Sequence, residues 1–387
     1  MKKILIYSLI FIFFFELTSI IFTKYKLLIF NEVPKYSFKE TNLFDWEEID
    51  ENGVNWHKKN HKSSHSSRCF DVSYEFNNVG ARDVNDYFTD DDKKSIILIG
   101  DSFAKGYGVD LNNTFAKIVE KRAEKKVLNF GFSGSDPKTQ VKKFINDGSN
   151  FNFDELIYFF LPSNDYSTNP KKESKKNYDE KNFFSEIDLM KIKYGIANFL
   201  ARFTYSYNFF RSTAYLLDIN FNNKYKNLSY FYKNRENIDY TFNYINNIVS
   251  YKDVKSYIVI IPIIHDINIY QKNKVNYKNL YWYKEINKLA KDNNSKIIDL
   301  MDFVDFKIKS KYFHSCDGHW SDYGNKFAAS SFLKIYREDW FIAQIFFSIE
   351  EKRKKTSNFK ETFVLFFLRG VLLPGAPDPV YLINDVN

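Results

Sequence analysis

The sequence contains little cysteine, no phosphate-binding loop and no basic stripe, and each absence excludes a class of function. Two cysteines in 387 residues, Cys69 and Cys316, are too few for a metal framework. The lysine of a phosphate loop would stand six residues after Gly100, where this chain has Gly106. The net charge of +8 comes from lysines scattered along the chain, without a nucleic-acid reading motif. We therefore expect no metal, no cofactor and no nucleic-acid partner.

Long hydrophobic runs are also scarce, and the one that is long enough to cross a membrane lies at the N-terminus. The run from Ile4 to Phe22 follows two lysines, and nineteen helical residues at ~1.5 Å each reach about 28 Å. No small-x-small cleavage site follows, which favours an uncleaved signal anchor over residues 1–30 rather than a removed signal peptide. Glu16 lies off centre, so it should cost less than the ~2.5–3.5 kcal/mol of a central acidic residue. We expect a membrane-anchored protein whose remaining chain lies on the exported side, periplasmic or extracellular.

Residues 31–69 have the composition of a polar linker. Within them His57, His61 and His65 are spaced four residues apart and would line one face of a helix as metal ligands. The surrounding segment is rich in serine and lysine, a composition typical of loops. A solvated loop is therefore the expectation, and a metal site is the alternative.

Between residues 70 and 340, short apolar runs alternate with helical stretches, the pattern of a doubly wound parallel sheet. The expected strands are Ile96–Ile99, Val127–Phe130, Leu156–Leu161, Tyr257–Ile261 and Ile297–Leu300. The expected helices are Thr114–Glu124, Thr139–Asp147, Ile238–Val249 and Leu280–Asp292. This alternation predicts a flavodoxin-like three-layer α/β/α fold with about five parallel strands. An insertion at about 166–236 carries an aromatic-rich helical piece, Phe199–Leu217, which we expect to cover the active-site side, and a helical extension at 341–387 ends the chain.

The chain carries the three residue types of a serine triad after these strands. Gly100-Asp101-Ser102 ends the first buried run and presents a hydroxyl where parallel α/β sheets bind their ligands. A serine hydroxyl is a poor nucleophile until a base removes its proton, and His319 can be that base. Asp317 stands two residues earlier and can hold the imidazole ring through its other nitrogen. The pattern predicts that Ser102, Asp317 and His319 are the catalytic residues.

The tetrahedral intermediate of acyl transfer also needs hydrogen-bond donors for its oxyanion. We expect these to be the backbone amides of Ser102 and Gly134 and the side-chain amide of Asn164. A competing nucleophile is Ser133, because residues 131–135 nearly match the Gly-x-Ser-x-Gly elbow of other hydrolases. Ser135 occupies the last position of that elbow, which disfavours this alternative.

Four separated blocks of the chain resemble, in order and spacing, those of the SGNH or GDSL family of serine hydrolases. They read Gly100-Asp101-Ser102, Ser133-Gly134, Asn164-Asp165 and Asp317-Gly318-His319. The resemblance covers about residues 70–340 and implies the same triad and oxyanion donors. The segment from Asn77 to Arg82 also resembles the Asn-x-x-Gly-x-Arg lead-in of many exported members.

Two departures from the family pattern stand out. One residue, Gly318, separates Asp317 from His319, where two are common. Pro162-Ser163 precedes Asn164, where the family usually has glycine. The first departure bears on the orienting role of Asp317, and the second on the approach of the Asn164 amide.

The resemblance implies an esterase that removes acyl groups, acetyl among them, from a cell-envelope or extracellular glycan through an acyl-enzyme. An O-acyltransferase acting on a surface polysaccharide beside a membrane acyltransferase is the first alternative, because it would use the same intermediate. A non-catalytic glycan-binding protein on the same fold is the second. Two unpaired thiols are the expectation for Cys69 and Cys316, and a disulfide between them in an oxidising compartment is the alternative.

Overall fold

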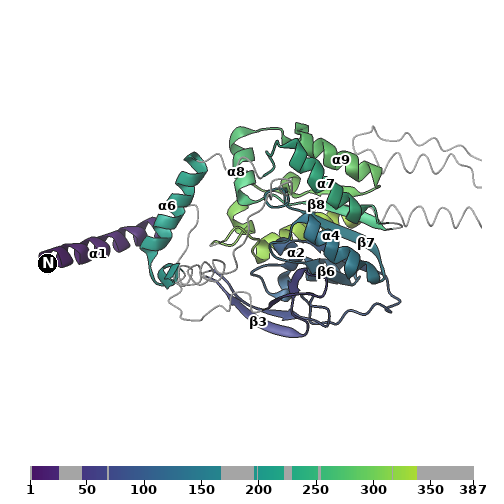
Figure 1. The fold of residues 1–387 in the computed structure, drawn as a ribbon. Helices are drawn as coiled ribbons and strands as arrows, with labels where there is room; N and C mark the ends of the chain where they lie inside the picture. The colour runs from purple at the N-terminus through teal and green to yellow at the C-terminus, as the bar shows by residue number, and fades with distance from the viewer. Residues whose placement is uncertain are drawn as a thin grey trace, which may run out of the picture. The chain divides into compact units, whose positions relative to one another are not determined.

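The structure is a computed structural model that describes residues 2–25, 46–67, 69–166, 196–197, 199–221, 229–251, 254–315 and 317–337 (Figure 1). The chain divides into two compact units, Met1–Leu333 and Lys334–Asn387. Most of the second unit, including the predicted extension at 341–387, lies outside the described residues. Cys316 and much of the predicted insertion lie outside them as well.

A five-stranded parallel sheet forms the centre of the first unit. Its strands are β5 (Ser95–Gly100), β6 (Val127–Gly131), β7 (Phe153–Phe160), β8 (Lys255–Ile260) and β9 (Lys296–Asp299). The strand order is β6-β5-β7-β8-β9, and every neighbouring pair is parallel. The chain passes from β5 to β6 on one side and then returns to β7 on the other, so the switch point lies beside β5. The predicted strands and the predicted fold class are confirmed.

Helices cover this sheet, and those that the sequence predicted are present. The helices α4 (Pro137–Asn146), α7 (Arg235–Val249) and α9 (Tyr281–Asp292) contact one another in that order. The helix α3 (Phe115–Ala123) packs against a helix over 322–337, where the rings of Phe115 and Phe332 lie 5.6 Å apart. The shorter elements are α2 (Ser102–Lys105), α8 (Ile264–Asn273) and the 3-10 turns Leu111–Asn113, Gly148–Asn150, Tyr277–Asn279, Leu300–Phe303 and Lys309–Tyr312.

The segment expected to be a polar linker instead forms strands over its described part. These are β1 (Glu47–Ile49) paired with β2 (Asn55–His57), and β3 (His61–Ser66) paired with β4 (Asp71–Phe76), all antiparallel. Alternate residues of β4 are buried in a cluster with Trp46, so a half-polar sequence still supplies one apolar face.

The histidines of this segment lie on strands rather than along a helix. The buried His57 uses Nδ1 with the Gly80 carbonyl at 2.9 Å, and the buried His65 uses Nδ1 with the Tyr74 hydroxyl at 2.8 Å. Burial lowers the pKa of both imidazoles, that of His65 to about 4. The solvated-loop interpretation is therefore wrong for these two side chains, which are core residues with hydrogen-bond partners.

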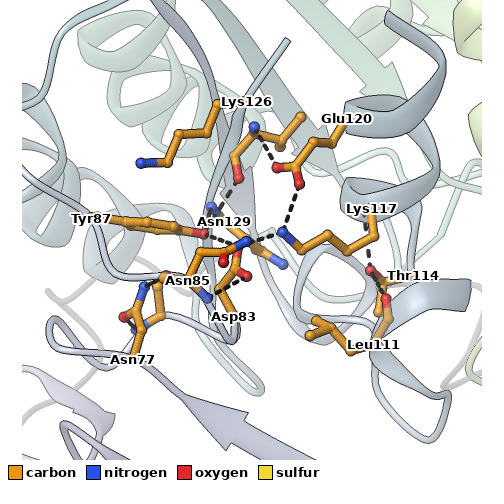
Figure 2. A network of polar contacts seen from close by, with 12 residues as sticks. Asn77, Asp83, Asn85, Tyr87, Leu111, Thr114, Lys117, Glu120, Lys126 and Asn129 are labelled. Atoms are coloured by element: carbon orange, nitrogen blue, oxygen red, sulfur yellow. Dashed lines mark hydrogen bonds and ion pairs between the residues drawn. The ribbon is translucent and has the colours of Figure 1, made fainter. Parts of the chain in front are cut away.

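The lead-in after Arg82 is bound to α3 and β6 by a polar network (Figure 2). Asp83 accepts a hydrogen bond from the Tyr87 hydroxyl at 3.0 Å and pairs with Lys117 at 2.8 Å. Lys117 also pairs with Glu120, whose other oxygen accepts the Val127 N–H at 3.0 Å. These bonds fix the segment that precedes β5 against the strand beside it.

The N-terminal apolar run is one helix, α1 (Lys2–Lys24). Residues Lys3–Lys24 have a mean hydropathy of 2.4 in their most apolar stretch, and by length and composition this helix could cross a membrane or serve as a signal sequence. The aromatic piece of the insertion is helical at 196–197 and 199–203 and forms α6 (Tyr205–Phe221). The contacts recorded for α6 are with α1, whereas the sequence predicted a cover over the active site.

Candidate active site

The turn after β5 presents Ser102 as the first residue of α2. The carboxylate of Asp101 caps this short helix by accepting the Phe103 N–H at 2.9 Å. The helix ends at Gly106, whose φ of +79° is a left-handed conformation that favours glycine. Gly100 ends the strand and the cap starts the helix at once, so the Ser102 side chain stands at the carboxyl edge of the sheet.

The predicted triad is assembled in the structure. Nε2 of His319 lies 2.7 Å from Oγ of Ser102, although the two residues are 217 positions apart in the chain. Nδ1 of His319 is hydrogen-bonded to Oδ1 of Asp317. This is the arrangement in which a base takes the serine proton while a carboxylate fixes the base's tautomer.

The short Asp317-to-His319 spacing is accommodated by a local turn. Oδ1 of Asp317 also accepts the backbone N–H of His319 at 2.9 Å, so one carboxylate oxygen holds both the ring and the main chain. Burial alone would raise the pKa of Asp317, but the hydrogen bonds and charge of His319 lower it to about 2. The orienting carboxylate is therefore ionised throughout the neutral pH range.

The structure brings the other two blocks to the same edge of the sheet. The Phe132 N–H donates to the Gly100 carbonyl at 3.1 Å, which sets the turn of Gly134 beside the nucleophile turn. Nδ2 of Asn164 lies 3.4 Å from the Ser135 carbonyl, which sets Asn164 beside the same turn. The roles of these amides in an oxyanion hole remain a prediction.

Local backbone geometry explains the glycine at 134 and its absence before Asn164. Gly134 has a φ of +74° and open space where a Cβ would stand, so the backbone conformation is what calls for glycine. Before Asn164, the Leu161 N–H donates to the Asp165 carboxylate at 2.7 Å and closes the turn. None of the residues with a positive φ lies in this turn, so the Pro162-Ser163 sequence fits it.

Two buried carboxyl groups lie behind the turns that carry these residues. Burial raises the pKa of Asp101 to about 6, while hydrogen bonds from Phe103 N–H and the Asn164 amide and the charge of His319 act to lower it. Burial and the neighbouring Asp101 charge raise the pKa of Asp165 well above its usual range. Simultaneous ionisation of Asp101 and Asp165 is therefore unfavourable. Two full negative charges beside the proposed oxyanion site are avoided.

Sequence reasoning missed the rings that hold His319 in place. The Tyr107 ring stacks on the imidazole with centroids 4.1 Å apart and planes at 27°, and the Phe103 ring lies 5.2 Å away. Both rings come from the segment that also carries Ser102, so one short segment supplies both Ser102 and the rings that pack on His319. Aromatic residues are too common in this chain, at 19% of its length, for these two to have been singled out.

Arg82 of the lead-in binds the backbone that carries Tyr107. Its guanidinium is fully buried and donates to the carbonyls of Lys105, Gly106 and Val109. The Gly108 N–H in turn donates to the Tyr74 hydroxyl of β4 at 2.9 Å. The lead-in and the β3–β4 hairpin thus fix the loop that follows the nucleophile helix.

Lys105, the last residue of α2, is a buried amine. Its Nζ lies 4.8–4.9 Å from the ring centroids of Trp46 and Tyr74 and has no hydrogen-bond partner among the described residues. Burial, followed by the charge of Arg82, lowers the pKa of Lys105 from 10.5 to about 7. Contact with aromatic faces offsets part of the cost of burying the charged form.

We expect Lys105→Met to stabilise the fold more at pH 7 than at pH 9. The unfolded chain keeps this proton up to pH 10.5 and the folded chain loses it above about pH 7, so wild-type stability rises across that window. The gain from the substitution should be on the order of 4 kcal/mol at pH 7 and about half of that at pH 9. Urea unfolding at both pH values measures it, with the exposed Lys142→Met on α4 as the control. Equal gains at the two pH values would contradict the prediction.

Cys69 lies between β3 and β4 and is disulfide-bonded, so the expectation of an unpaired thiol is wrong for this residue. The other cysteine of the sequence, Cys316, lies outside the described residues, and their pairing stays a prediction. Non-reducing peptide mass spectrometry would detect the linked pair.

Comparison with known proteins finds likeness at the level of solved structures. No family model matches the sequence, and no curated protein matches it significantly. A member of the lipolytic G-D-S-L family from Veillonella parvula DSM 2008 is 14% identical, covering 63% of this chain and 98% of that one, with a TM-score of 0.35. A lipase/acylhydrolase from Enterococcus faecalis is 16% identical, over 62% and 94%, with a TM-score of 0.35. An acetyl xylan esterase is 14% identical, over 62% and 98%, also with a TM-score of 0.35. At these values the chain is similar to GDSL-family structures, and its chemistry has to be argued from its own site.

Proposed function

We propose that this protein is a serine esterase of the SGNH type. The observation that carries the proposal is the contact of 2.7 Å between Nε2 of His319 and Oγ of Ser102, with Asp317 bound to the opposite nitrogen. A neutral imidazole that carries its proton on Nδ1 directs the lone pair of Nε2 at the Ser102 hydroxyl, as proton removal requires.

In the first half of the proposed reaction, Ser102 attacks the ester carbonyl while His319 takes its proton. The carbonyl oxygen becomes an oxyanion, stabilised by the amides of Ser102 and Gly134 and by the Asn164 side chain. His319 then gives the proton to the leaving alcohol, and the acyl group stays on Ser102. Asp317 remains ionised throughout and stabilises the imidazolium that forms.

In the second half, the oxygen of an acceptor hydroxyl attacks the acyl carbon while His319 takes its proton. The bond between the acyl group and Oγ of Ser102 then breaks, and His319 returns the proton to Ser102. If the acceptor is water, the protein is a hydrolase, and if it is a sugar hydroxyl, the protein is an O-acyltransferase. For the substrate we propose an acylated glycan of the cell envelope or exterior, with acetyl as the first acyl group to test. Support for this location comes from α1, whose length and composition suit a membrane anchor.

The proposed nucleophile can be tested directly by covalent labelling. A fluorophosphonate probe should react with the full-length protein in detergent, and peptide mass spectrometry should place the adduct on Ser102. Prior heat unfolding should abolish the reaction, since an isolated serine is unreactive. An unlabelled folded protein would favour the non-catalytic alternative. Incubation of acetylated glycan with and without an acceptor sugar then separates hydrolysis from transfer by the product formed.

A further inference from the structure

The helix α1 carries one acidic residue within its apolar sequence, and that residue has a partner far along the chain. Oε1 of Glu16 accepts the Tyr205 N–H at 2.6 Å, and Oε2 accepts the Ser206 N–H at 2.9 Å. Tyr205 and Ser206 are the first two residues of α6. The first amides of a helix have no partner inside it and carry partial positive charge, so they match a carboxylate in both hydrogen bonding and sign.

The face of α1 that carries Glu16 is also the face that is covered. Ser19 and Thr23 follow at helical spacing and are 1% and 5% exposed, while most other side chains of α1 are exposed. Phe209 of α6 packs edge-to-face against Phe15 and Phe22, with centroids 6.1 Å and 5.3 Å apart. Small polar residues at the seam of two helices are typical of pairs that associate in lipid.

Large apolar side chains of the helical insertion that leads into α6 and of α6 itself are exposed among the described residues. Ile196, Phe199 and Phe210 are 58%, 52% and 66% exposed. Most side chains of α1 are also apolar and exposed, and by length and composition α1 is suited to hydrocarbon. A lipid bilayer would cover the apolar surface of α1 and the exposed apolar side chains of the insertion together.

The position of Glu16 sets a depth for this contact. Glu16 stands eight residues before Lys24, or about 12 Å along the helix axis, within the C-terminal half of a hydrocarbon core of about 30 Å. An unpaired carboxylate at that depth is costly, and residues kept in such places have partners. Arg211 of α6 is exposed and has a stem long enough to reach the interface.

We infer that residues 196–197 and 199–211 form a second membrane-embedded element, which lies in the leaflet at the C-terminal end of α1 and is held there by Glu16. On this assignment the insertion after β7 is a membrane contact, and Glu16 is the residue that joins it to the anchor. The inference concerns lipid contact only and is independent of whether Ser102 is a nucleophile.

The test uses the full chain in phosphatidylcholine vesicles that contain doxyl-labelled lipid. The environment-sensitive fluorophore NBD is attached at Phe210→Cys, at Phe11→Cys in α1 as the lipid reference, and at Lys291→Cys on α9 as the water reference. Labelling without reductant spares disulfide-bonded Cys69, and the unsubstituted protein reports any background. We expect blue-shifted, lipid-quenched emission at positions 11 and 210 and unquenched emission at 291.

The role of Glu16 is tested by adding Glu16→Ala to each labelled protein. We expect quenching to be lost at position 210 and kept at position 11, with the thermal unfolding of the protein otherwise unchanged. An unquenched label at 210 in the parent protein would overturn the inference, whether a second copy of the chain or water occupied that face. Quenching at 210 that survives Glu16→Ala would overturn the role assigned to Glu16.

Discussion

Replacing Ser102 by alanine is expected to lower kcat for p-nitrophenyl acetate by about 10⁶, the loss typical of a removed triad nucleophile. The methyl group cannot form the acyl-enzyme, and the contact with Nε2 of His319 disappears with the hydroxyl. The oxyanion donors remain, so a residual acceleration of about 10³–10⁴ over the reaction in water should persist. Initial rates of the full-length protein in detergent measure both values.

Ser133→Ala is the matched control for this prediction. Ser133 lies in the neighbouring turn and is the serine that the elbow-like sequence Gly131–Ser135 offers as a competitor. It should keep activity within a few-fold of the parent protein. Parental activity in the Ser102→Ala protein would refute Ser102 as the nucleophile. A loss of about 10⁶ in kcat for the Ser133→Ala protein would refute it as well.

Asp317→Asn is expected to lower kcat by about 10⁴ with little change in KM. The neutral amide does not stabilise the imidazolium, and its NH2 group can donate to Nδ1, which leaves the ring proton on Nε2 and removes the base. The substitution tests the one-residue spacing directly, because the same oxygen also accepts the His319 N–H. kcat and KM for p-nitrophenyl acetate, measured from pH 5 to 9, provide the comparison.

Asp322→Asn is the matched control for the orienting carboxylate. Asp322 lies near the triad in sequence, and its carboxylate accepts only the exposed Asn113 amide among the described hydrogen bonds. It should leave kcat near the parental value. If Asp317→Asn retained most of its activity, the carboxylate would not be the group that orients His319.

The sequence was sufficient to predict the sheet and the grouping of Ser102, Asp317 and His319 in one place. A strand buried on both faces needs an unbroken apolar run, as in Ile96–Ile99, and such runs are visible without a structure. The turn chemistry is equally local, because Asp101 caps α2 two residues on and Asp317 binds His319 two residues on. Strands and turns that depend on neighbouring residues in this way can be predicted from the sequence.

The sequence misjudged the segment before the domain for an equally physical reason. Buried polar residues such as His57 and His65 look like surface residues until their hydrogen-bond partners are known. Tyr74 lies on β4, the strand that pairs with the strand of His65, and Gly80 lies in the segment after β4. A histidine spacing that would suit a helix therefore carried no information about two antiparallel strands.

The chain by itself thus determined which residues could react, since the identity and order of Ser102, Asp317 and His319 are written in it. Tertiary structure alone decided which distant segments of the chain contact one another. Arg82 binds a loop more than twenty residues away, and Glu16 binds an amide 189 residues away. Contacts of this kind depend on packing between distant segments, and no local propensity or periodicity encodes them.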